Sequence, residues 1–371
     1  MKKLIMALII IVYIAITPLT TYGAEGIDVN IYAEEFMEME RAIEGADTAF
    51  DINMPSIFRD AIAGDLDLSP AGLLNSFLRL LFSEVLDHAS LLRNLLVIGI
   101  VSAILHNITT SFSDSSVGEI GFYVSYLAMV TMLFSSFRIA VSIFSELMMT
   151  ISLFIDAGIP LFIGLVVMSG NVAGATVFNG ILVFAVAFVG RLISWFIGPA
   201  IMSAAALHMI NFIDQKDILS NLATLIKKGI SWTLKILAIG IVSIISIQRI
   251  STPLANNLLM RATRSAVNTV PVVGSVLSGA LENVMYLARM LRGGVLVVVI
   301  ITMVAICLIP MLKLFALMLT YKIAAALIQP ICDERIVDCL EVAGDYTALL
   351  LSAAAIVSMM FMVSVVIMLT I

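Results

Sequence analysis

Charged residues are scarce in this chain of 371 residues. Asp, Glu, Lys and Arg together make up 12% of it, whereas about 25% is usual in a soluble globular domain. Hydrophobic residues make up 61%, which leaves too little polar surface to keep a chain of this length in water. The composition therefore excludes an ordinary soluble domain and indicates a protein whose main solvent is the lipid bilayer.

Cysteine and histidine are also few, and they are scattered. Cys307, Cys332 and Cys339 have no metal-ligand spacing and cannot form an even disulfide set. Cys307 lies inside an apolar run, where we expect a small core residue. The phosphate-binding pattern GxxxxGK, the zinc-binding pattern HExxH and the nucleophile pattern GxSxG are all absent from the sequence. We therefore expect no enzyme activity, no metal, no cofactor and no nucleic-acid partner.

Long apolar runs, by contrast, are abundant, among them residues 181–189, 295–310 and 348–371. About 20 apolar residues form a helix that crosses the roughly 30 Å of hydrocarbon in a bilayer. Lipid offers no partner for an unpaired N–H or C=O, so only helices and closed barrels cross it, and these runs lack the alternation of barrel strands. The sequence predicts an all-α, polytopic helical membrane protein with six to eight spans.

The N-terminal part of the chain has a different character. Residues 1–24 have a basic start, a short apolar core and small residues near positions 21–24. These features are typical of a cleaved secretory signal peptide, and the alternative is an uncleaved first span. Residues 25–67 hold twelve carboxylates and two arginines, with too little apolar material for a core of their own. We expect an acidic segment outside the cytoplasm, with one helix at 33–43, that either meets a partner protein or forms a solvated tether.

Residues 68–90 begin with Ser69-Pro70, a preferred helix cap followed by a preferred first helical residue. Apolar side chains then recur on one helical face. This pattern predicts an amphipathic helix that lies in the membrane interface or packs against other membrane helices. Two spans are expected next, within residues 91–138.

The remainder of the chain contains an internal repeat. Pro160 and Pro199 are 39 residues apart, Pro271 and Pro310 are equally spaced, and the two pairs are offset by 111 residues. Proline breaks the hydrogen-bond ladder of a helix, and a broken ladder in a membrane must be buried in protein or line a watered cavity. We therefore expect the stretches that begin at Pro160 and Pro271 to meet where the two halves pack, related by a pseudo-two-fold axis. The two halves are residues 139–250 and 251–371.

Each half also contains a short amphipathic helix followed by glycine, at 217–228 before Gly229 and at 333–343 before Gly344. Glycine often follows the last residue of a helix, so we expect both helices to end there and a terminal span to follow each. Whether the two halves are inverted or parallel stays open, because the sequence does not decide whether the proline stretches cross the membrane fully.

Three basic residues are expected at membrane depth. Arg191 lies in an apolar run, Lys313 follows Pro310, and Lys322 lies between Tyr321 and Ile323. A central charge costs about 2.5–3.5 kcal/mol on insertion scales. We interpret these residues as a polar path or gate between the halves; the alternatives are structural pairing and, for Lys322, extension toward the interface. The nearby carboxylates available as partners are Glu146, Asp156 and Glu282.

Several segments resemble one known family. They are Pro271-Val272-Val273-Gly274, the arginine-containing stretch 261–264 before it, and residues 321–330, which read YKIAAALIQP. Together with the signal peptide, the acidic segment and the amphipathic helix, they resemble the stage III sporulation protein AE family of endospore-forming bacteria. The expected loop at Gly344-Asp345-Tyr346 is not part of this resemblance.

The resemblance implies a component of the multiprotein channel between the mother cell and the engulfed forespore, located in the outer forespore membrane. It implies partners that include an ATPase, ring-forming subunits and a forespore docking protein, and it supplies no catalytic residues. Two alternatives stay open: a stand-alone secondary transporter, and a membrane scaffold unrelated to sporulation.

Overall fold

The computed structural model describes residues 32–48, 53–63, 70–111, 115–168, 188–211, 221–240, 243 and 273–370. Every regular element in these ranges is helical. The expected signal peptide and Pro271 lie outside the described residues. The elements are α2 (Ala33–Ala42), α3 (Met54–Ala63), α4 (Pro70–Asp87), α5 (Ala89–Ser111), α6 (Ser115–Met168), the π-helical turn η2 (Ile193–Ile197), α8 (Gly198–Asn211), a helix of residues 221–240, α10 (Val273–Ile328) and α11 (Glu334–Thr370).

Four of the described helices are long and apolar enough to cross a membrane: Tyr126–Leu165, Phe188–Asn211, Gly293–Ile328 and Glu334–Val366. A fifth crossing is possible if α4 and α5, which meet at a 42° bend, count as one span. The prediction of an all-helical membrane protein is therefore confirmed. The number of six to eight spans stays a prediction.

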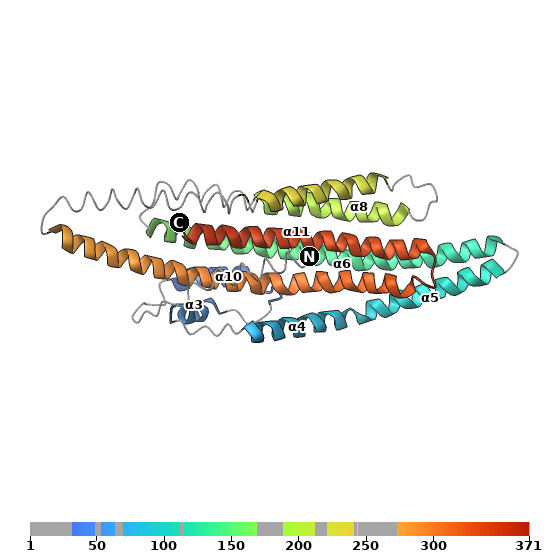
Figure 1. Ribbon diagram of the computed structural model, residues 1–371, viewed down its shortest axis with the longest axis horizontal. Helices are drawn as coiled ribbons and strands as arrows, with labels where there is room; N and C mark the ends of the chain where they lie inside the picture. The colour runs from blue at the N-terminus through green and yellow to red at the C-terminus, as the bar shows by residue number, and fades with distance from the viewer. Residues whose placement is uncertain are drawn as a thin grey trace.

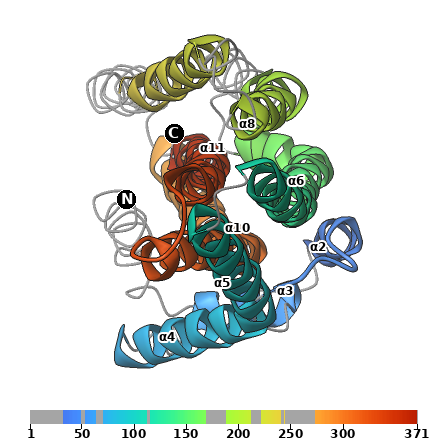
Figure 2. The same cartoon turned by 90° about the vertical axis from the view of Figure 1, so that its right-hand side faces the viewer.

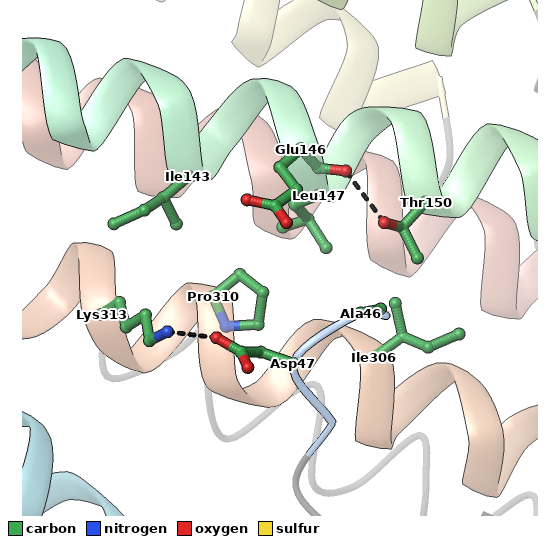
Figure 3. A pocket seen from close by; sticks show the side chains of 9 residues that line it. All are labelled: Ala46, Asp47, Ile143, Glu146, Leu147, Thr150, Ile306, Pro310 and Lys313. Carbon is green, nitrogen blue, oxygen red and sulfur yellow. Dashed lines mark hydrogen bonds and ion pairs between the residues drawn. The ribbon is translucent and has the colours of Figure 1, made fainter. Parts of the chain in front are cut away.

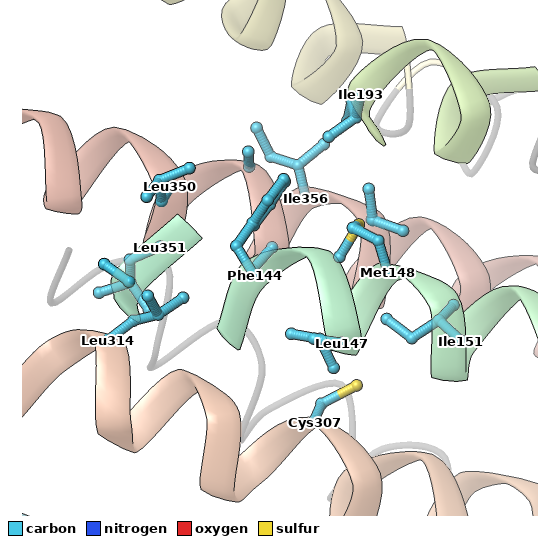
Figure 4. Close-up of a cluster of buried hydrophobic side chains, with 14 of the residues drawn as sticks. Phe144, Leu147, Met148, Ile151, Ile193, Cys307, Leu314, Leu350, Leu351 and Ile356 are labelled. Atoms are coloured by element: carbon cyan, nitrogen blue, oxygen red, sulfur yellow. The ribbon is translucent and has the colours of Figure 1, made fainter. Parts of the chain in front are cut away.

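The helices lie alongside one another in an elongated bundle (Figure 1). Viewed from the end, α8 and the helix of residues 221–240 cover one side of α11 and α6, and α4 and α5 lie on the opposite side (Figure 2). The α10–α11 pair packs more extensively than any other pair. Side chains of α6, α10 and α11 meet in the centre of the bundle (Figure 4). Among them are Phe144, Leu147, Met148, Cys307, Leu314, Leu350 and Ile356.

Buried hydroxyl groups connect these helices. The Tyr126 hydroxyl donates a hydrogen bond to the Met209 carbonyl at 2.8 Å, and the Tyr321 hydroxyl donates to Ser136 Oγ at 2.8 Å. A hydroxyl in an apolar interior costs free energy unless it finds such a partner. These bonds therefore favour one register of α6 against α8 and α10. The expected core position of Cys307 is confirmed, since this residue is buried.

The acidic segment packs on the bundle. Its expected helix at 33–43 is present as α2, and α3 follows it. Phe36 and Phe58 are fully buried, with ring centroids 5.3 Å apart, while α2 contacts α6 and α3 contacts α10. The segment thus uses the apolar surface of the membrane helices in place of a core of its own. In its described residues, 32–48 and 53–63, the segment lies against the bundle and does not form a solvated tether.

Both expected helix ends at glycine are wrong. The helix of residues 221–240 continues through Gly229, and α11 continues through Gly344, so Gly344-Asp345-Tyr346 is helical and not a loop. A Cβ added at Gly344 would lie 3.0 Å from Lys322 Cε. The glycine therefore provides room for the side chain of a neighbouring helix. The second of the two spans expected within residues 91–138 does not end there, because α6 runs on to Met168.

The expected break at Pro160 is wrong as well. Pro160 lies inside α6 and Pro310 lies inside α10. Proline removes one backbone hydrogen bond and clashes with the preceding turn, but Leu161, Phe162 and Leu165 directly after Pro160 are buried. Their packing holds the helix together across the lost bond.

Pro199 lies at the second position of α8, directly after the π-helical turn. There the Gly198 N–H bonds to the Ile193 carbonyl, five residues earlier. Such a bulge relieves the crowding that proline causes in an α-helix. The internal repeat and its pseudo-two-fold axis stay predictions.

Candidate functional site

One carboxylate joins three helices. The Lys322 Nζ atom of α10 is 2.6 Å from Asp345 Oδ1, and the Lys227 Nζ atom of the 221–240 helix is 2.9 Å from Asp345 Oδ2. Each lysine therefore holds a different oxygen of the same α11 side chain. The three side chains are 29% to 43% exposed, so water reaches the charges and part of their attraction is screened.

A tyrosine and a histidine extend this group to a fourth helix. The Lys227 Nζ atom lies 5.3 Å from the centroid of the Tyr346 ring, a cation–π arrangement. The Tyr346 hydroxyl is 3.3 Å from Nδ1 of His208 on α8. We refer to Lys227, Lys322, Asp345, Tyr346 and His208 as the Asp345 cluster. With the histidine neutral, it carries a net charge of +1, from two lysines and one aspartate.

A second ion pair ties the acidic segment to α10. Lys313 Nζ lies 2.5 Å from Oδ2 of Asp47, which follows α2. The pair borders a cavity of about 30 Å³, which Glu146 and Thr150 of α6 and Pro310 also line (Figure 3). A cavity of this size with polar walls has room for a water molecule. The Lys313–Asp47 pair thus adds to the apolar contacts that hold the acidic segment, beside a cavity with both polar and apolar walls.

The structure brings together some of the predicted residues. Lys313 and Lys322 both form ion pairs, but with Asp47 and Asp345, not with the carboxylates proposed from the sequence. Glu146 lines the Lys313 cavity without bonding to the lysine. The Glu282 side chain lies outside what the structure describes.

Arg191 belongs neither to the Asp345 cluster nor to the Lys313–Asp47 pair. It is exposed, and within the described ranges no ion pair links it to Asp156 or to any other carboxylate. Of the four prolines, Pro310 borders the cavity, and Pro160 and Pro199 lie elsewhere. The three predicted basic residues therefore do not form one continuous path.

Sequence reasoning missed Asp345, Tyr346, Lys227, His208 and Asp47. A signal for Asp345 was present, because it is the last charged residue before the long uncharged end of α11 and directly follows a glycine. The described ranges contain no group of three or more His, Cys, Asp or Glu side chains placed to hold a metal ion.

Four helices long and apolar enough to cross a membrane, joined by partly exposed ion pairs, define this chain as a helical membrane protein. Comparison with known proteins then gives its family. The model of the Stage III sporulation protein AE family matches residues 52–371, so the chain belongs to this family. The chain is 27% identical over 310 residues to the Stage III sporulation protein AE of Bacillus subtilis (strain 168), covering 83% of this chain and 78% of that protein.

No solved structure matches the chain. Family membership confirms the resemblance seen in the sequence and supports a sporulation-related role. The family match begins at residue 52, so α2 and Asp47 precede it.

Proposed function

We propose that this protein is a non-enzymatic membrane component of the channel complex that connects mother cell and forespore. It resides in the outer forespore membrane and works with an ATPase, ring-forming subunits and a forespore docking protein. The observation that carries this proposal is the family match over residues 52–371, together with four helices of membrane-spanning length and composition.

The ion pairs suggest how such a component works. Lys322 and Lys227 hold Asp345 between three helices, so the helices separate only if these contacts break. Because the pairs are partly exposed, their separation costs little, and water replaces the lost contacts. We assign the Asp345 cluster the role of a reversible contact that the rest of the complex opens.

A clean deletion in the native host tests the proposal. Engulfment should finish and forespore development should then stall, because the forespore lacks what the channel supplies. Heat-resistant spores are counted after the deletion and after return of the wild-type gene. A normal spore count from the deletion strain would overturn the proposal.

A second experiment distinguishes the transporter alternative. The purified protein in liposomes should move no solute by itself, because the proposed channel needs its partner proteins. Solute flux through the protein alone would identify a stand-alone secondary transporter.

A further inference from the structure

The chain covers its own membrane helices unevenly. In the most apolar 18 residues of each candidate span, 67% is buried in α10 and 78% is buried in α11. The corresponding values are 33% for Tyr126–Leu165 of α6 and 39% for Phe188–Asn211. The flank formed by α6 and the helix that contains α8 is therefore the less covered part of the bundle.

An arginine lies on this flank among exposed aromatic side chains. Arg191 is exposed, Trp195 one turn later is 83% exposed, and Phe196 is 74% exposed. Arg191 lies three residues inside the candidate span Phe188–Asn211, and an unpaired charge inside a span costs free energy. Tryptophan, phenylalanine and arginine are the residue types enriched in the buried centres of protein interfaces.

An aspartate lies on the neighbouring exposed face of α6. Asp156, Pro160, Ile163 and Gly164 recur at helical spacing, and all four are exposed. A Cβ added at Gly164 would meet no atom within 4 Å, so the helix surface there is open to close approach by another helix. Within the part of the chain that the structure describes, Asp156 has no ion-pair partner.

The two charges lie at similar levels of the bundle. A Cβ added at Gly198 would lie 3.3 Å from Phe144, so these two positions are level. The chain runs in opposite directions along α6 and α8 (Figure 1). Arg191 precedes Gly198 by seven residues and Asp156 follows Phe144 by twelve. Their levels therefore differ by about five residues, or roughly 8 Å, a gap that a long arginine side chain can largely bridge.

We propose that this flank is an interface with a second copy of the same chain, in which Arg191 of each copy pairs with Asp156 of the other. The chain itself carries both complementary charges, on α6 and on the helix that leads into α8, and α6 contacts α8. A two-fold rotation about the membrane normal keeps their levels and forms both pairs in one interface. Within the described residues neither charge has an ion-pair partner, and a second copy supplies one to each.

Charge exchange in the purified full-length protein tests this interface. Self-association is measured in nanodiscs and in detergent, over a range of protein concentrations, for wild type, Arg191→Asp, Asp156→Arg and the double variant. Each single change places like charges opposite each other and should weaken association at least about tenfold. The double variant restores opposite charges and should return association to near the wild-type level. The matched control is Lys235→Asp, an exposed charge reversal on the 221–240 helix, which should have no effect.

Cross-linking supplies a measurement that does not depend on charge variants folding. Copies that carry Trp195→Cys are mixed with copies that carry Met149→Cys, an exposed position of α6 near the level of Trp195, both with Cys332→Ser, and disulfide-linked dimers are expected. A wild-type protein that stays monomeric throughout, or a double variant that fails to restore what the single variants lose, overturns the proposal. So does cross-linking in cells only to a different membrane protein. The test uses purified protein, so its failure would leave the proposed role in sporulation untouched.

Discussion

At the scale of single residues, Asp345 is the point on which the charged contacts depend. It neutralises Lys227 and Lys322 at once, and each lysine bonds a separate oxygen. Removal of one lysine leaves an intact pair, whereas removal of the carboxylate leaves two positive charges close together. Replacement of Asp345 should therefore destabilise the protein more than replacement of either lysine.

We predict that Asp345→Asn lowers the free energy of unfolding by about 1–2 kcal/mol, a value below that of a buried pair because the partners are partly exposed. Lys322→Met should cost less. The control is Glu341→Gln, an exposed carboxylate on α11, which should change stability by less than about 0.5 kcal/mol. Denaturant titration of the protein in detergent micelles measures all three. Equal stability of Asp345→Asn and wild type would contradict the prediction.

At the scale of elements, apolar runs predicted the helices well and local signals predicted their ends poorly. The helix at 33–43 and the helix that begins at Pro70 were found, because capping and periodicity are local properties. Gly344 and Pro160 were expected to interrupt helices, yet tertiary packing overrides both. Gly344 makes room for Lys322, and buried neighbours hold α6 together after Pro160.

The candidate site was also predicted only in part, because contacts between distant parts of the chain leave no local signal in the sequence. Lys313 and Lys322 were identified because a charge in an apolar run is visible in the sequence. Their partners were not, since the Lys313–Asp47 pair joins residues 266 positions apart. Periodicity carries no information about such a contact, and only the packing of α2 and α3 on the bundle forms it.

A variant of Gly344 tests whether this glycine is needed to make room for the Lys322 side chain. Gly344→Val should displace the Lys322 side chain, because even a Cβ would lie 3.0 Å from Lys322 Cε. We expect lower thermal stability and a cross-link between α10 and α11 that forms less readily. Gly229→Val is the matched control, because nothing lies within 4 Å of its added Cβ. If both variants behave alike, close packing is not the reason for glycine at position 344.

At the scale of the whole molecule, the long helices exceed what a bilayer needs. The 56 residues of α10 extend about 84 Å at 1.5 Å per residue, against roughly 30 Å of hydrocarbon. Beside these helices lies α2, whose inner residue Met39 is 3.2 Å from a Cβ added at Gly158 of α6. Glu34 and Glu38 face outward from α2. A carboxylate in hydrocarbon is costly, so we predict that water reaches this outer face of α2.

Thiol labelling in membrane vesicles tests this arrangement. A cysteine at Glu38→Cys should react with a charged, membrane-impermeant reagent, because the outer face of α2 is hydrated. A cysteine at Met39→Cys, fully buried against α6, should stay unreactive although it is the next residue along the chain. Trp195→Cys should also stay unreactive, because its flank faces lipid or a second copy. Reaction is measured from each side of the membrane, and a signal peptide, if the sequence prediction holds, directs labelling to the exocytoplasmic side. If the reagent fails at Glu38→Cys from both sides, another protein or the bilayer covers the acidic face, and an aqueous flank along α2 is excluded.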